Sequence, residues 1–171
     1  AASDVYKRQR MFRAEQLHYT QVVPLDKIPE YRKQGNTSYV QAAYLGTYYY
    51  LVNTDRPPVD NVLVRRALSY ALDRDTLTRT VLQETAIPAY SITPPDTLGY
   101  NPPKLFDYDP AKARELLAEA GYPNGEGWPG LEIIYNTQEA HRKIAVAVQQ
   151  MWKKELNIDV TISNQEWKVY L

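Results

Sequence analysis

Helix-like and strand-like segments alternate between residues 109 and 162, and this alternation constrains the fold more than any other feature. Asp109-Pro110 begins a helix that Gly121 ends, and Gln138–Leu156 has the apolar spacing of a longer helix. Leu131–Tyr135 and Ile158–Ile162 have the composition and alternation of strands. Strands separated by helices favour a layered arrangement over a helical bundle, so we expect an α/β (mixed α+β) fold.

Apolar residues at helical spacing predict which helix faces form the core. Asp60 or Asn61 caps a helix that runs to Leu72, and Asp73-Arg74-Asp75 caps a second helix through Gln83. The residues expected to face inward in the three clearest helices are Leu63, Ala67, Tyr70 and Ala71, then Ala113, Leu116, Leu117 and Ala120, and last Ile144, Val148, Met151 and Trp152.

The first third of the chain has weaker patterns. The composition predicts strands over Leu17–Thr20, Tyr39–Tyr44 and Thr47–Asn53, and a helix over Leu25–Gln34 that Gly35 ends. Residues 1–9 carry mixed charge without periodicity and are expected to be a disordered lead or a sequence-end artefact. Six of the twelve prolines lie in residues 88–110, which predicts an ordered surface loop or a linker.

The far end of the sequence suggests a piece of a larger protein. Residues 165–171 look like the first turn of a helix that is then cut off. We therefore expect a fragment.

Composition excludes several classes of protein. Lys+Arg and Asp+Glu each total 20, which argues against nucleic-acid binding driven by net positive charge. The chain has no cysteine, so it has no disulfide framework and no thiol nucleophile. Fifteen tyrosines and three tryptophans against two phenylalanines favour half-wet surfaces that bind mixed polar and apolar ligands.

Familiar enzymatic motifs are missing or misplaced. Residues 125–130 match the G-x-G-x-x-G pattern, but a helix precedes them and a strand follows, the reverse of a dinucleotide site. His18 and His141 are the only histidines, too few and too distant for a metal set. The carboxylate pairs Asp73/Asp75 and Asp107/Asp109 fall at helix starts, where capping explains them. No active site or cofactor follows from these residues.

One group of residues is better suited to binding a ligand. Asn136 follows a strand and precedes the longest helix, where it forms a capping box with Glu139. His141 lies in or just beyond the first turn, beside free amides that favour a carboxylate. Trp167 comes at the next strand-to-helix turn, and such turns share one edge of an α/β layer. Each residue also has an interpretation without a ligand. His141 could be an ordinary solvated surface histidine, and Trp167 could be an ordinary core or hinge tryptophan.

The tyrosine run Tyr48-Tyr49-Tyr50 adds an aromatic surface. Side chains alternate across a strand, so at least one of the three points away from the others. Core packing alone would also explain this run.

Several blocks of sequence resemble family 5 extracellular solute-binding proteins, the peptide-capturing subunits of ABC importers. They are Gly46–Asn53, Val62–Asp75, Pro88–Pro95, Ala113–Gly121, Tyr135–Thr137, Ile144–Val148, Met151–Lys154 and Asn164–Lys168. The last three resemble the oligopeptide-binding type of this family in particular.

The resemblance implies a fragment of a periplasmic-binding-protein type II-like three-lobe flytrap fold, in which two lobes close over a peptide. Residues 10–46 would be the end of lobe I and residues 47–171 the first part of lobe III, incomplete. The element that holds the peptide amino terminus would follow Leu171.

The resemblance also implies partners and a location. These are short peptides and the ABC permease membrane subunits, with no nucleic acid and no cofactor. We expect a monomer that does not act as an enzyme, in the periplasm or as a lipoprotein on the outer side of the cytoplasmic membrane. A family 5 protein for a dipeptide, murein peptide, nickel chelate or haem remains an alternative, as do a chaperone-like binding protein and, less favoured, a hydrolase.

Carried over position by position, the ligand-binding residues would be His141, Asn136, Trp167, Tyr49 and Tyr48. His141 would face the carboxylate end of short peptides, and Trp167 would line a side-chain pocket. One position departs from the family pattern. Relatives can carry a lysine near Leu82 that also serves the carboxylate end, whereas Leu82 is apolar.

Overall fold

The computed structural model describes residues 2–33 and 37–170. In chain order its elements are α1 (Ala2–Arg13), η1 (Leu25–Lys27), α2 (Ile28–Lys33), α3 (Val62–Tyr70), α4 (Arg74–Thr76), η2 (Leu77–Val81), α5 (Pro110–Glu119), η3 (Pro123–Gly125), β1 (Leu131–Asn136), α6 (Glu139–Leu156), β2 (Val160–Gln165) and α7 (Trp167–Tyr170).

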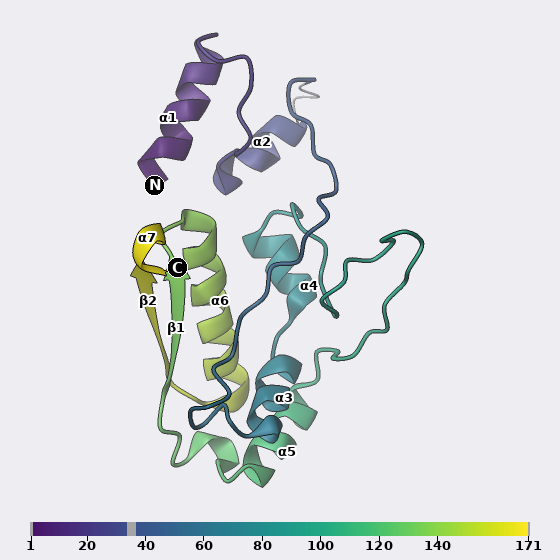
Figure 1. Cartoon of the computed structure of the whole chain (residues 1–171), viewed down its shortest axis with the longest axis vertical. Helices are drawn as coiled ribbons and strands as arrows, with labels where there is room; N and C mark the ends of the chain where they lie inside the picture. Colours follow the sequence, from purple (N-terminus) through teal and green to yellow (C-terminus); the bar gives the residue numbers. More distant parts are fainter. Residues whose placement is uncertain (1, 34–36, 171) are drawn as a thin grey trace.

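The C-terminal half is built around two parallel strands and the helix that joins them. β1 pairs with β2 in a register that runs from Leu131 opposite Val160 to Asn136 opposite Gln165. α6 makes the crossover and packs against the sheet (Figure 1). The alternation predicted from the sequence is therefore confirmed, with the second strand displaced toward the C-terminus. Both strands end at the same edge, and this positions the candidate site.

α3 and α5 pack together and extend the core beside α6. The indole of Trp152 on α6 is buried and donates a hydrogen bond of 2.9 Å to the carbonyl oxygen of Leu68 on α3. Most of the residues expected to face inward are buried, whereas Leu63, Tyr70, Ala120 and Met151 are only partly buried. The fully or largely buried set is Val64, Ala67, Leu68, Ala71, Ala113, Leu116, Leu117, Ile144, Val148 and Trp152.

Side-chain caps fix where three helices begin. Asn61, rather than Asp60, caps α3 by accepting a hydrogen bond from the amide of Leu63. Asp73 caps α4 through Thr76, and Asp109 caps α5 through Lys112. Asp75 and Asp107, which were also expected to cap helices, do not. Asp75 accepts a hydrogen bond from the Tyr90 hydroxyl, and Asp107 forms an ion pair with Lys104.

The helix expected to run through Gln83 is shorter and changes type. α4 passes directly into the π-helical turn η2, which ends at Val81. Gln83 and Glu84 then both adopt left-handed backbone conformations, with φ of 53° and 57°.

The N-terminal residues correct the expected disorder. Except for Ala1, which lies outside the described residues, residues 1–9 are part of the helix α1. α1 lies beside α2 (Figure 1), where Gln9 is buried and donates to the hydroxyl of Tyr31 at 2.8 Å. The helix expected over Leu25–Gln34 is divided into η1 and α2, and Gln34 and Gly35 lie outside the described residues.

The three strands expected in the first third are wrong. Leu17–Thr20, Tyr39–Tyr44 and Thr47–Asn53 form no strand in this structure, all of them within its described residues. Residues 37–61 run as a long irregular segment past α4 to α3 (Figure 1). β-propensity reflects fit to a neighbouring strand, and here no such neighbour pairs with these residues.

The proline-rich stretch is an ordered loop tied to the rest of the structure. The Thr47 hydroxyl donates to the carbonyl oxygen of Ile92 at 2.7 Å. The Lys104 ammonium lies 4.2 Å from the ring centre of Tyr90. These contacts confirm the surface-loop interpretation.

Candidate ligand-binding site

The carboxyl ends of β1 and β2 bring four predicted elements together. β1 ends at Asn136 and α6 begins three residues later, while β2 ends at Gln165 and α7 begins at Trp167. Figure 1 shows α7 and the N-terminal end of α6 at the same end of the sheet. The first amides of α6 have no partner within the helix, which favours an anionic group there.

Asn136 orients His141 rather than capping the helix. The Oδ1 atom of Asn136 lies 2.7 Å from Nδ1 of His141. The expected capping box is therefore wrong: the N-cap residue is Gln138, and Glu139 pairs with Lys143 at 2.9 Å. Asn136 is the last residue of β1, and α6 begins three residues later. The Asn136 side chain can therefore reach His141 in the first turn of α6.

This contact determines which ring nitrogen of His141 is left to act as an acceptor. An amide oxygen only accepts, so Nδ1 of His141 donates and Nε2 carries no proton while the ring is neutral. In the described part of the chain, Nε2 has no hydrogen-bond partner. Burial is the main cause that lowers the pKa of His141, and the backbone of Asn136 opposes this effect.

Tyr48 lies against this imidazole. The two ring centres are 5.2 Å apart with an interplanar angle of 42°. Tyr48 also meets Tyr50 edge-on, with ring centres 5.9 Å apart. Tyr48 and Tyr50 therefore share one side of the segment, as the alternation predicted.

Tyr50 is a site residue that the sequence did not single out. Its hydroxyl is buried and has no hydrogen-bond partner among the described residues. Burial is the main cause that raises the pKa of Tyr50. An unsatisfied buried hydroxyl is unfavourable. The alternation of the tyrosine run was the signal available for it.

Trp167 belongs to a second aromatic pair at the same edge. It is 54% exposed and stacks on Tyr170, with ring centres 6.1 Å apart. Burial is the main cause that raises the pKa of Tyr48, and the phenol of Tyr170 adds to the rise. Trp167 thus lies on the open surface rather than in the core.

Two positions are separate from this group. Tyr49 is 58% exposed and makes no ring contact or hydrogen bond with the described residues. Leu82 is partly buried and packs against the hydrophobic core, so it offers nothing to a carboxylate.

The chemistry available here is recognition through donors, aromatic faces and a hydroxyl. The described residues contain no group of three or more side chains that would hold a metal ion. The glycine pattern at residues 125–130 is a turn, because η3 precedes it and β1 follows. Within residues 2–33 and 37–170, no helix has the length and apolar character needed to cross a membrane.

Comparison with known proteins identifies the family. The model of the bacterial extracellular solute-binding proteins, family 5 Middle, matches residues 2–171. The chain belongs to this family of solute-binding proteins.

Individual relatives agree with this assignment. The oligopeptide-binding protein OppA of Bacillus subtilis is 38% identical over 87% of this chain and 28% of that protein. A solved periplasmic oligopeptide-binding protein of Borrelia burgdorferi has a TM-score of 0.87 at 38% identity, covering 97% of this chain and 33% of that one. The fold is thus that of periplasmic binding proteins of the OppA type, and the chain spans about a third or less of the relatives it matches.

Two structures of the murein tripeptide-binding protein MppA also match. The Escherichia coli structure has a TM-score of 0.86 at 37% identity, over 96% of this chain and 33% of that one. The structure described as the unliganded open form has a TM-score of 0.76 at 36% identity, over 97% and 33%.

Proposed function

We propose that this chain is part of a peptide-capturing subunit of an ABC importer, called the parent protein below. Residues 10–46 and 47–171 belong to its lobes I and III, and a peptide lies between them. The parent protein works in the periplasm or as an outer-surface lipoprotein, as a monomer, and it delivers peptides to membrane permease subunits without changing them covalently.

The arrangement of His141 carries this proposal. Asn136 holds its Nδ1 and leaves Nε2, in the first turn of α6, without a hydrogen-bond partner among the described residues. A protonated imidazole and free helix amides together form a site for a terminal carboxylate. The relatives named oligopeptide-binding proteins supply the matching ligand class.

The aromatic residues account for tolerance of varied side chains. Tyr48 and Trp167 are about half exposed and present flat, amphipathic surfaces beside the carboxylate site. Such rings pack against apolar and polar side chains alike, and water fills what remains. Asn136 acts with His141 by holding its ring, whereas Tyr49 is assigned to the cleft only by family resemblance.

Calorimetry on the parent protein tests the proposal. Titration with tripeptides and tetrapeptides should release or absorb heat and raise the melting temperature. If no peptide of either length produces heat or a melting shift, the proposal fails.

A second ligand of the same class is murein tripeptide, favoured by the TM-score of 0.86 with MppA. A competition assay between murein tripeptide and an ordinary tripeptide shows which of the two ligands the parent protein binds more tightly. Displacement of the ordinary tripeptide at equal or lower concentration would assign the site to murein tripeptide.

A further inference from the structure

The turn after η2 has an unusual and well-fixed backbone. Gln83 and Glu84 are consecutive non-glycine residues in the left-handed region. Such residues persist only where surrounding contacts hold them. Here the amide of Glu84 donates to the carbonyl oxygen of Thr78 at 2.9 Å, and the side-chain amide of Gln83 donates to the backbone carbonyl oxygen of Thr80 at 2.6 Å. The turn therefore moves with η2 as one unit.

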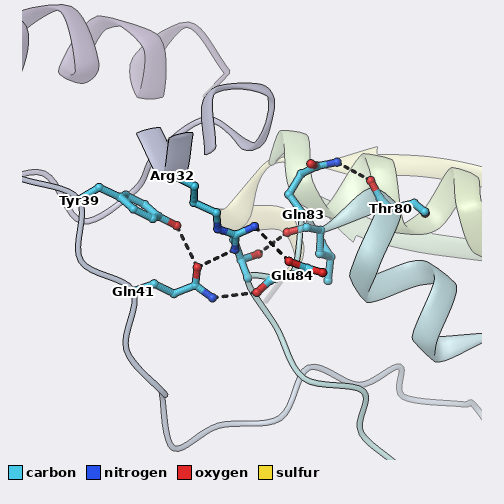
Figure 2. Close-up of polar contacts among 8 residues, drawn as sticks. Arg32, Tyr39, Gln41, Thr80, Gln83 and Glu84 are labelled. Carbon is cyan, nitrogen blue, oxygen red and sulfur yellow. Dashed lines mark hydrogen bonds and ion pairs between the residues drawn. The ribbon is translucent and has the colours of Figure 1, made fainter. Parts of the chain in front are cut away.

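Residues from the N-terminal part of the chain form hydrogen bonds with this turn. Nε2 of Gln41 donates to the carbonyl oxygen of Glu84 at 2.8 Å. Oε1 of Gln41 accepts from Arg32 at 2.7 Å and from the Tyr39 hydroxyl at 3.1 Å. Figure 2 shows Gln41 between these partners. We call Arg32, Tyr39, Gln41 and Glu84 the Glu84 latch.

The hydrogen bond from the Gln41 side chain to the Glu84 carbonyl oxygen is the main contact between the two sides of the latch. The ion pair of Arg32 with Glu84 is 3.5 Å long, and the Glu84 side chain is 68% exposed. An exposed pair of this kind contributes little. The bond from Gln41 to the Glu84 backbone is short, and Arg32 and Tyr39 hold the amide in the orientation that makes it.

The Glu84 latch joins the two proposed lobes beside an open cleft. Arg32, Tyr39 and Gln41 fall within residues 10–46, and Glu84 within residues 47–171. The cleft has a volume of about 570 Å³. Leu25 and Asp26 line it from the first segment, and Gln83 lines it from the second. Gln83 directly precedes Glu84, whose carbonyl oxygen Gln41 binds. The latch therefore holds Gln83 on one side of the cleft close to the N-terminal segment on the other side.

The two MppA structures match this chain to different degrees. This chain matches the E. coli structure with a TM-score of 0.86 and the unliganded open form with a TM-score of 0.76. Identity and coverage are nearly equal in the two comparisons. This chain therefore superposes less well on the unliganded open form than on the other MppA structure.

We propose that the Glu84 latch forms when the lobes close and breaks when they open, so that Gln41 is a positioning residue for peptide capture. The inference rests on the proposed function. A contact made in one state only shifts the population toward that state by its own free energy. Breaking the latch should lower the closed population and speed peptide release.

The substitution Gln41→Glu tests the latch in the parent protein. A glutamate keeps the oxygens that accept from Arg32 and Tyr39 but loses the donor to the Glu84 carbonyl. Loss of one such bond should weaken tripeptide affinity about threefold to tenfold, mostly through faster dissociation. Gln16→Glu is the matched control, because it makes the same chemical change at an exposed glutamine of the N-terminal segment that lies outside the latch, and it should change affinity less than twofold.

A second measurement does not depend on peptide binding. The chain has no cysteine, so cysteines introduced at the exposed residues Arg10 and Glu119 can carry spin labels, one in each proposed lobe. Distance distributions without peptide and at saturating peptide should shift toward the open arrangement in Gln41→Glu and stay unchanged in Gln16→Glu.

The outcomes separate the latch from the proposed function. Unchanged distances and dissociation rate in Gln41→Glu would overturn the latch, and so would weaker binding without any shift in distance. If the parent protein binds no peptide, the proposed function fails, while the distances without peptide still decide whether the latch exists.

Discussion

Nδ1 of His141 lies 2.7 Å from Oδ1 of Asn136, and this contact joins the end of β1 to the first turn of α6. It leaves Nε2 as an acceptor while the ring is neutral. Burial lowers the pKa of His141, so the neutral form prevails at pH 7. Donation to a peptide carboxylate therefore requires His141 to take up a proton.

Tripeptide binding to the parent protein should be accompanied by proton uptake between about pH 6 and 7. The carboxylate raises the pKa of His141 in the complex, so affinity should rise as pH falls through this range. Calorimetry in buffers of different ionisation enthalpy measures the uptake, up to about one proton. His141→Gln should abolish it, and uptake that persists in this variant would assign the proton to another group.

The same residue gives a stability prediction of opposite sign. The folded pKa is lowered, so the unfolded chain binds its proton first as pH falls below about 6.5. The contribution of His141 to the free energy of unfolding should therefore decrease from pH 7 toward pH 5. Urea unfolding of the parent protein without peptide measures this slope, which should be shallower in His141→Gln.

Peptide length should matter for the effect of His141→Ala. If the imidazole faces the carboxylate of short peptides, this variant should weaken tripeptides about tenfold and longer peptides less, because a charge-assisted hydrogen bond is lost only for the former. Dissociation constants for peptides of three to six residues provide the comparison. Equal losses at every length would remove the carboxylate role.

Asp109→Ala should destabilise the parent protein by about 1 kcal/mol, since Asp109 caps α5 through the amide of Lys112 at 2.9 Å. Asp107→Ala is the matched control, because Asp107 is exposed and caps no helix, pairing instead with Lys104. It should cost about 0.5 kcal/mol or less. The free energy of unfolding in urea distinguishes them, and equal losses would contradict the assignment of the cap.

Gly125→Ala should destabilise by more than Gly127→Ala. Both glycines have a positive φ, 78° and 73°, so both substitutions carry backbone strain. A Cβ at Gly125 would also lie 2.5 Å from the carbonyl oxygen of Asn157, whereas at Gly127 nothing lies within 4 Å. We expect losses of about 3 and about 1 kcal/mol. Unfolding free energies that do not differ would mean that the turn moves away from α6.

Several features could be read from local sequence because local physics determines them. The cap at Asp109, the end of α5 at Gly121 and the apolar stripe of α6 depend on residues within a few positions of one another. The strands around Ile133 and Ile162 were identifiable because a helix separates them and both alternate. The place of His141 at the start of α6 followed from the same pattern.

Other features depend on contacts between distant segments, and the sequence alone gave the wrong answer for them. Thr47–Asn53 has strand composition, but no described strand pairs with it, so Tyr48 and Tyr50 instead lie near α6 and α7. Residues 2–9 lack helical periodicity, but the partner of Gln9 is Tyr31, 22 positions away. In the sequence, Asn136 has the spacing of a helix cap. In the structure it is the last residue of β1, and its side chain contacts His141 instead.

The sequence by itself determined the family, the helices with their caps, and the edge where β1 and β2 end, because these depend on short-range spacing and on residues shared with relatives. Only the tertiary structure decided that the Tyr50 hydroxyl is buried without a hydrogen-bond partner among the described residues. It alone also decided that Asn136 orients His141 and that Gln41 donates to the backbone of Glu84. These contacts join segments up to 43 positions apart. No local pattern contains them, because a side chain finds such a partner only after the chain has folded.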